Sequence, residues 1–494
     1  MKKHVVVIGG GIAGLSAGVY AQKCGFNVTI LESHNIAGGN CTAWKRKGYL
    51  FEGGMHWLTG SNKNEPIYRL WTHIGALDDS VEMHYPEPFK EFHYKGEVIC
   101  LYRDIDRTEQ HLIALSPADE KPIRDLCNSV RKVEKLVMPL MDIKGVKVTK
   151  KNRPSLRLLF RVLHANYSMR KASKIPKEAY IRRFKHKGIQ ALLTFLTTDK
   201  HSATWLFFSM ANRARGDAGF PQGGSLPFVN RIVKTFKDAG GEIIFNQPIT
   251  RVAVKDGKAT GVGSESFFLS CDAVIVTADT MQMDYLFETP PKAQWLDEMR
   301  AKALPTMCVF VSLGIDADLT QYAKNCTFKL DSPLRVGRYN HLLITINNYA
   351  NDPTYSPKGK AAVTLLLLGD SYDFWKNSKD EGRYEAEKEK IAQGIIEALA
   401  SQLPETKDKV EVYDVATPLT YERYCANWRG SWMTMMAHTM RIRPYPPKVD
   451  NLENVYFGGH RMRAPGGLPI AAISGRAAVQ YLCRDTDTLF ISED

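Results

Sequence analysis

The chain contains 494 residues, of which 44% are hydrophobic and 24% charged, which is enough for two or three layers of structure around well-filled cores. No stretch approaches the roughly 20 consecutive apolar residues of a membrane span, and the N-terminus lacks a signal-peptide pattern, so we expect a cytoplasmic protein. Nine cysteines are scattered along the chain and never spaced as CxxC, which favours free thiols over disulfides or a metal site. We therefore expect no bound metal.

The first predicted element is a buried parallel strand over Val5–Ile8, an uninterrupted apolar run rich in β-branched residues. It leads directly into a GxGxxG motif made by Gly9, Gly11 and Gly14. In such a motif the first glycine permits a tight turn, the second lets the backbone approach a pyrophosphate, and the third lets the following helix pack on the strand. That helix is predicted over residues 12–23.

The N-terminus of this helix, with Ile12 and Ala13, is expected to face the phosphates of a bound dinucleotide. A second strand is predicted over residues 27–31, and it delivers Glu32, followed by Ser33. Glu32 can accept hydrogen bonds from ribose hydroxyls. A strand, glycines, a helix, a strand and an acid arrive in this order within about thirty residues, so together they predict a dinucleotide-binding site.

The segments after this acid distinguish NAD from FAD. They contain the pair Gly38-Gly39, then Asn40, and then the stretch Gly48-Tyr-Leu-Phe-Glu-Gly-Gly-Met-His-Trp57. These motifs resemble the flavoprotein superfamily of amine oxidases, phytoene desaturases and retinol saturases. The later stretch is most similar to the desaturase and saturase branch. The resemblance implies that the dinucleotide is FAD.

In this family the glycine pair wraps the FAD phosphates, and the resemblance implies that Gly54, Met55 and His56 lie in the segment that runs past the flavin. Many members carry an arginine directly after the glycine pair, where this chain has Asn40. Arg46 and Lys47 are the candidates to meet the phosphate in place of that arginine.

Later segments repeat the resemblance in the middle of the chain. Residues 219–227 resemble the family's P-x-GG segment and open a predicted helix that ends near Asp238, before a hairpin that turns at Asp256-Gly257. By family analogy Val252 lies against the adenine. Residues 272–279 form an apolar run that we expect to return to the first sheet as a buried strand.

The C-terminal region holds the last expected pieces of the cofactor site. A strand is predicted over 454–459, and a glycine loop leads from it into a helix over 470–482 with a proline at its first turn. The resemblance implies that this loop and helix N-terminus meet the isoalloxazine through Gly459, Gly467, Leu468 and Pro469. The positive end of the helix dipole would there stabilise negative charge on the reduced ring. Residues 455–475 contain no cysteine, so the FAD is expected to be noncovalent.

We therefore predict an α/β fold with a discontinuous Rossmann-type FAD-binding domain and a second, α+β substrate-binding domain. The FAD-binding domain is expected over residues 1–90, 215–290 and 415–494, and the substrate-binding domain over 91–214 and 291–414. Strand-like runs at 307–315, 342–347 and 361–368 and a helix over 384–403 belong to the second domain.

Most of the positive charge lies in one segment. Residues 144–188 contain fifteen Lys and Arg and a single acid, Glu178, whereas the whole chain has a net charge of +13. Within it, residues 153–167 form a basic amphipathic helix pattern. One interpretation is peripheral contact with an anionic membrane on its inner face, and the other is a core-packed helix with a solvated charged face. Nucleic acid is a poor partner because no recognition motif accompanies the charge.

A flavin would carry the redox step, so few catalytic side chains are obligatory. His56 is the first candidate for a polar group beside the ring, and Tyr424 is a second; Arg429, His460 and Arg461 are weaker ones. The resemblance implies an oxidoreductase that saturates, desaturates or isomerises a carbon–carbon bond of a long, lipophilic isoprenoid such as a carotenoid or retinoid. Hydride would pass at flavin N5, and NAD(P)H or another donor or acceptor would complete the cycle.

Two alternative functions are compatible with the same predicted fold. One is an FAD-dependent amine or amino-acid oxidase, which usually needs aromatic walls and a carboxylate or lysine-bound water near the flavin. The other is a non-enzymatic prenyl-binding protein that resembles the GDP-dissociation inhibitors. The intact phosphate and isoalloxazine glycines argue against the second alternative. The sequence does not choose between saturation and desaturation.

Overall fold

The computed structural model describes residues 2–136, 139–150, 174–196, 202–431, 433–436, 444–463 and 466–492. Its first layer is a five-stranded parallel sheet built from β1 (His4–Ile8), β2 (Asn27–Leu31), β9 (Glu242–Ile244), β13 (Ala273–Val276) and β21 (Val455–Phe457). The strand order is β21-β13-β1-β2-β9, and every neighbouring pair is parallel. The prediction that distant segments return to the N-terminal sheet is therefore confirmed.

The strand β1 is apolar throughout because both faces of this sheet are covered. Val5 and Val7 pack in one core cluster, while Val6 and Ile8 pack in another on the opposite face. The first cluster includes residues of the helices α1 (Ile12–Lys23), α9 (Ser225–Asp238) and α14 (Leu468–Asp485). The second includes residues of the three-stranded sheet β10 (Arg251–Lys255), β11 (Lys258–Gly263) and β12 (Phe268–Ser270).

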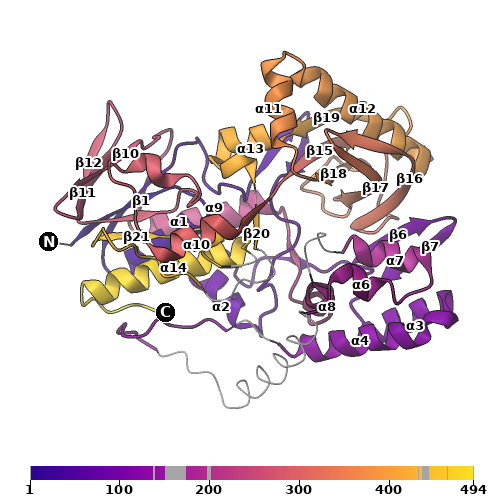
Figure 1. The fold of residues 1–494 in the computed structure, drawn as a ribbon, viewed down its shortest axis with the longest axis horizontal. Coiled ribbons are helices and arrows are strands. Elements are labelled where there is room, and N and C mark those ends of the chain that lie inside the picture. Colours follow the sequence, from indigo (N-terminus) through magenta and orange to yellow (C-terminus); the bar gives the residue numbers. More distant parts are fainter. Residues whose placement is uncertain are drawn as a thin grey trace.

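The helices α1 and α14 pack unusually closely. A methyl group on Gly475 of α14 would collide with the carbonyl oxygen of Ala13 in α1. The Ser16 hydroxyl donates a 2.8 Å hydrogen bond to the carbonyl of Ala472. Small residues on both helices thus bring α1 and α14 side by side next to the parallel sheet (Figure 1).

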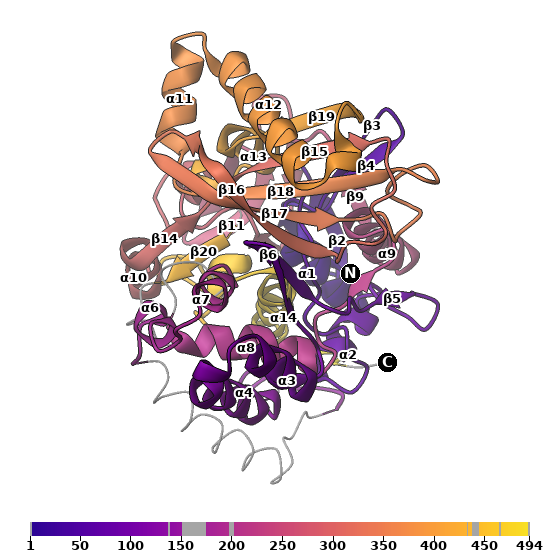
Figure 2. The same ribbon diagram turned by 90° about the vertical axis from the view of Figure 1, so that its right-hand side faces the viewer.

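A larger sheet of seven strands forms the second half of the molecule. Its order is β19 (Val410–Ala416), β15 (Cys308–Ile315), β18 (Ala361–Leu368), β17 (Tyr339–Asn348), β16 (Asn325–Val336), β6 (Lys90–Tyr94) and β7 (Glu97–Leu101). Helices α11 (Tyr372–Asp380) and α12 (Tyr384–Gln402) share a hydrophobic core with it. Figure 2 shows these helices above the sheet and a second group of helices below it.

The second group consists of α3 (Ile105–Leu115), α4 (Glu120–Glu134), α6 (Lys177–Ile181), α7 (Lys187–Thr194) and α8 (Ala203–Ala214), which share a core with β6 and β7. The remaining elements named below are α2 (Pro66–His73), α10 (Gln294–Lys302), α13 (Pro418–Cys425) and the hairpin β3 (Ala43–Arg46) and β4 (Tyr49–Glu52). The predicted α/β fold with an added α+β region is confirmed.

The basic segment is described only in part, because the predicted helix over 153–167 lies outside the described residues. Residues 177–181 form α6, in which Tyr180 and Ile181 are buried. The Lys177 side chain is also buried, and its ammonium donates a 2.9 Å hydrogen bond to the carbonyl of Thr194. Across the helices that the structure describes, none is long and apolar enough to span a bilayer.

Candidate active site

One large cavity, of about 2190 Å³, joins the two halves of the molecule. At one end it is lined by the glycine turn between β1 and α1 and by the carboxyl end of β2. At the other end it is lined by the strands β16, β17 and β18 of the seven-stranded sheet and by α8. The segment around His56 lies in the same wall. A ligand at the glycine turn and a ligand at the larger sheet would therefore share one continuous space.

The glycine turn is shaped for close backbone approach. Gly9 adopts a left-handed φ of +101°, and a methyl group on Gly14 would collide with the Gly9 carbonyl. Gly11 is the N-cap of α1 and supplies no capping side chain, so the first amide groups of the helix have no side-chain acceptor from the cap. These features fit the pyrophosphate of a dinucleotide, which accepts hydrogen bonds from such a helix N-terminus.

The carboxylate of Glu32 completes this end of the cavity. One oxygen accepts a 2.6 Å hydrogen bond from the amide of Gly10 and the other a 2.8 Å bond from the amide of His34. A carboxylate offers about four acceptor sites, so Glu32 keeps capacity for ribose hydroxyls. These backbone contacts fix the orientation of the Glu32 carboxylate at this end of the cavity.

The structure brings most of the predicted site residues to this one cavity. Its lining includes Gly9, Gly11, Ile12, Ala13, Glu32, Ser33, Gly38, Gly39, Asn40, Gly54, His56, Tyr424, Gly459, Gly467, Leu468 and Pro469. Gly14 lies behind this wall, and Met55 and Val252 are buried in core clusters. Residues 247–250, just before Val252, line the cavity instead. Direct cofactor contact stays a prediction for all of these residues.

The C-terminal loop approaches the cavity through an unusual backbone. The N-cap of α14 is Gly467, with a left-handed φ of +86°, and Pro469 occupies the first turn. Before this loop, Arg461 forms a buried ion pair with Asp279 at 2.6 Å. Burial alone would raise the pKa of Asp279, but Arg461 outweighs it and holds that pKa below its ordinary value. Arg461 therefore ties the loop to the end of β13 instead of facing a substrate as a free cation.

The two leading catalytic candidates lie in different surroundings. Burial, with a smaller effect of Lys324, lowers the pKa of His56 to about 4, and its ring stacks on Phe310 at 5.9 Å. His56 is consequently neutral at pH 7 and is no imidazolium acid there. The ring of Tyr424 meets His34, two residues after Glu32, at 5.2 Å. This contact associates Tyr424 with the ribose end, and its catalytic role stays a prediction.

The structure corrects the expectation about the missing arginine. Arg46 and Lys47 lie on the turn of the β3–β4 hairpin, where Arg46 pairs with Asp414 at 3.1 Å and Lys47 is exposed. Neither lines the cavity, because the hairpin directs them toward the solvent side. Arg423 of α13 lines the cavity instead, and Asn427 donates a 2.6 Å hydrogen bond to Asn40.

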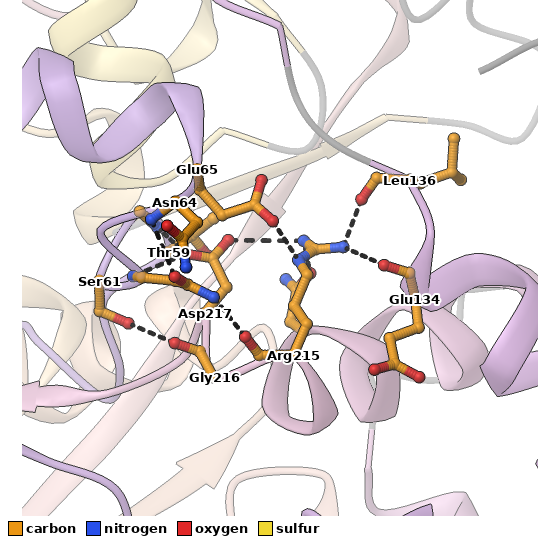
Figure 3. Close-up of polar contacts among 12 residues, drawn as sticks. Thr59, Ser61, Asn64, Glu65, Glu134, Leu136, Arg215, Gly216 and Asp217 are labelled. Carbon is orange, nitrogen blue, oxygen red and sulfur yellow. Dashed lines mark hydrogen bonds and ion pairs between the residues drawn. The ribbon is translucent and has the colours of Figure 1, made fainter. Parts of the chain in front are cut away.

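Sequence reasoning missed two cations at the far end of the cavity, Lys90 of β6 and Arg213 of α8. The end of α8 is fixed by a polar network (Figure 3). In it, Arg215 contacts Glu65 and Asp217 at 3.4 Å each, and Asp217 accepts a 2.7 Å hydrogen bond from the amide of Gly60. The sequence feature that could have pointed to Arg213 is the charged motif Arg-Ala-Arg-Gly-Asp at residues 213–217. This network holds α8 against the chain that follows His56.

One group of potential metal ligands occurs in the described part of the chain. Glu91, His93 and Cys326 place their ligand atoms within 4.8 Å of one another. They already interact, since His93 contacts Glu91 and the thiol of Cys326 donates a 3.5 Å hydrogen bond to Glu91. Burial, with the nearby Glu91, raises the pKa of Cys326 and keeps the thiol protonated. The expected absence of a metal stays a prediction.

A doubly covered parallel sheet, a glycine turn at its carboxyl edge and a long adjoining cavity define a dinucleotide-binding fold. The family model described as flavin containing amine oxidoreductase matches residues 12–483, and the chain belongs to this family. It is therefore a flavin-dependent oxidoreductase, which disfavours the inhibitor-like alternative.

Individual relatives support the same family assignment. An all-trans-retinol 13,14-reductase from Danio rerio is 25% identical over 86% of this chain and 76% of its own length. A 4,4'-diaponeurosporene oxygenase from Staphylococcus aureus is 21% identical over 96% of this chain and 97% of its own length. The solved structure of an oxidoreductase from Methanosarcina mazei has a TM-score of 0.60 at 17% identity, over 97% of this chain and 100% of that one. The predicted resemblance to the retinoid and carotenoid flavoproteins is confirmed.

Proposed function

We propose that this protein is an FAD-dependent oxidoreductase that adds or removes hydrogen across a carbon–carbon bond of a long, lipophilic isoprenoid. The observation that carries the proposal is the size and continuity of the cavity. Its 2190 Å³ exceeds the range of about 300–1,000 Å³ that is usual for a small-ligand pocket. It thus has room for a dinucleotide and for an extended second ligand beside it.

The walls of the second part of the cavity suit an apolar chain. On the helical side they include Phe195, Trp205 and Phe208, and on the sheet side Leu343 and Leu366. Large apolar and aromatic side chains gain free energy when they cover a hydrocarbon. These walls favour a hydrocarbon substrate over a small polar amine.

The cofactor would be held by this chain's own groups. The amide groups at the start of α1 would bind the pyrophosphate, Glu32 the ribose, and the N-terminus of α14 the pyrimidine edge of the isoalloxazine. A bound flavin would supply the hydride transfer. Neutral His56 would offer a hydrogen bond within the same wall, and the surrounding apolar side chains would exclude water from the reacting carbons.

The names of the relatives support the substrate class, because one is named for retinol reduction and another for oxygenation of diaponeurosporene. Saturation, desaturation and isomerisation are all consistent with the site. The electron donor or acceptor, NAD(P)H or another, is part of the proposal. We also propose that residues 144–188 contact an anionic membrane surface from which a lipophilic substrate is drawn.

The decisive experiment starts with the purified holoprotein. Its flavin is released by denaturation and identified by mass, and the enzyme is then mixed anaerobically with all-trans-retinol and with a conjugated enone, from the oxidised and from the reduced state. Flavin absorbance and product mass together should reveal hydrogen transfer to or from a carbon–carbon bond. A colourless protein that takes up no FAD, or a flavoprotein that turns over only amines, would refute the proposal.

A further inference from the structure

Two cations face the substrate part of the cavity without an acidic partner. Lys90 is only 5% exposed, and its ammonium donates a 3.4 Å hydrogen bond to the hydroxyl of Thr345 on β17. Arg213 donates hydrogen bonds of 2.9 and 2.8 Å to the carbonyl and hydroxyl of Ser209, one turn earlier in α8. Within the described part of the chain, neither forms an ion pair with a carboxylate.

Aromatic rings hold the guanidinium of Arg213 in place. Its centre lies 4.7 Å from the ring of Trp57 and 5.0 Å from the ring of Phe89. Ring faces stabilise a guanidinium electrostatically, yet they leave its in-plane N–H groups available to an acceptor. Trp57 directly follows His56, and Phe89 directly precedes Lys90. The two cations are thus connected to the wall that carries the candidate catalytic histidine.

The acids that line the cavity have other partners. Asp279 pairs with Arg461, and Asp370 contacts Arg429. The third acid, Glu32, belongs to the ribose end. The cation pair therefore contributes an excess of positive charge at the end of the cavity remote from the predicted ribose site.

Such an arrangement is costly unless a ligand compensates it. Burial lowers the pKa of Arg213 to about 10. Burial also lowers the pKa of Lys90 to about 7, and the charge of Arg213 acts in the same direction. An unpaired buried charge destabilises a fold. A bound anion would reverse this penalty by pairing with both cations.

We propose that Lys90 and Arg213 bind the carboxylate of an isoprenoid acid whose apolar chain extends along the cavity toward the cofactor site. This inference rests on the proposed function and adds a polar head group to its substrate. The planar fork of a guanidinium matches the two oxygens of a carboxylate, and the ammonium of Lys90 adds a second charge. Asn325 and Asn347 line the same region and bring further amide groups.

The test compares two probes that share one hydrocarbon chain, all-trans-retinoate and its methyl ester. Their binding to the oxidised holoenzyme is measured at pH 6.5, a value chosen so that Lys90 carries its charge, through quenching of tryptophan fluorescence and perturbation of the flavin spectrum. We expect retinoate to bind about 10- to 100-fold more tightly than the ester, as a charge-assisted hydrogen-bonded pair predicts. The variants R213M and K90M should each lose about tenfold or more in retinoate affinity and keep ester affinity within about twofold.

Matched variants separate binding from folding. R107M removes another arginine that stacks on an aromatic ring, Tyr102 at 3.8 Å, but outside the cavity, and it should change neither affinity. If R213M does not retain flavin, R213K keeps the charge without the fork and should give an intermediate retinoate affinity.

The outcomes distinguish the two proposals. Binding of neither probe by the flavin-loaded enzyme overturns the proposed function and this inference with it. Equal binding of both probes, unchanged in K90M and R213M, overturns the inference alone and leaves the proposed function in place. Equal loss of both probes in the variants also overturns it, because the cations would then act only on structure.

Discussion

Because Lys90 is buried without an acidic partner, we predict that its replacement by an uncharged residue stabilises the protein, although Lys90 belongs to the proposed substrate site. Burial lowers the pKa of Lys90 from its ordinary 10.5 to about 7. At pH 7 this shift corresponds to roughly 4 kcal/mol of lost folding free energy, because the unfolded chain binds the proton far more tightly. K90M keeps most of the side-chain volume and removes the charge. The hydroxyl of Thr345 keeps a partner, since it also bonds to Thr327 at 2.7 Å.

The size of the effect on melting temperature follows from chain length. The entropy of unfolding is about 2.1 cal/mol/K per residue, or roughly 1 kcal/mol/K for a chain of 494 residues. K90M should therefore raise Tm by up to about 4 °C at pH 7 in the absence of substrate. The control K329M removes an exposed lysine from β16, the strand next to β6, and should shift stability by less than about 0.5 kcal/mol.

The pH dependence of the stability difference between K90M and the wild type tests this reasoning more sharply than the rise in Tm at pH 7 does. The folded-state pKa of Lys90 lies below the unfolded one, so wild-type stability rises relative to K90M as pH increases from 7 to 10.5. The advantage of K90M, measured by scanning calorimetry, should accordingly shrink toward zero near pH 10.5. A Tm of K90M that is equal to or lower than that of the wild type at pH 7, or an advantage that grows with pH, would refute the reasoning.

Three further outcomes are expected. Retinoate affinity should fall as pH rises through about 7, because Lys90 loses its charge there, beside Arg213 and the protonated Cys326. In K90R the affinity, measured by tryptophan quenching, should depend less on pH. A pH profile of K90R identical to that of the wild type would contradict this prediction. E32Q should weaken FAD binding by about 10- to 100-fold, measured by fluorescence of released FAD; retention of full affinity would exclude the ribose role. Binding to anionic liposomes, measured by sedimentation, should weaken as salt is added. It should also weaken in K185Q/K187Q, because both of the replaced lysines are exposed in the wild type. Binding that changes in neither case would reject the membrane contact.

The dinucleotide half was predictable from local patterns. The glycine turn places α1 at residues 12–23, as its motif predicts, because Gly9 adopts a left-handed φ and Gly14 leaves no room for a side chain. The returning strands β13 and β21 were predictable for a related reason: a strand covered on both faces is a short, uniformly apolar run. Such patterns are local, so they can be recognised in a single sequence.

The proposed substrate end of the cavity was not predictable, because its chemistry arises only in the folded chain. Lys90 and Arg213 come from distant segments, and an isolated basic residue is normally solvent-exposed. The strand β16 was also missed, since it contains Asp331-Ser-Pro333 and its pairing shifts register between Lys329 and Leu334. A turn-like tripeptide inside a strand hides the alternation that sequence reasoning depends on.

The close packing of α1 with α14 has a consequence for how the protein is made. The edge strand β21 and the helix α14 complete the N-terminal sheet, yet most of the described chain separates them from β1 and α1, so they leave the ribosome long after those two elements. Until then the apolar face of α1 that covers α14 has no partner, and long-range contacts of this kind form slowly. We therefore expect cofactor capture to wait until β21 and α14 have been made. A chain truncated before residue 455 should expose the unfinished sheet edge and aggregate before it can take up flavin.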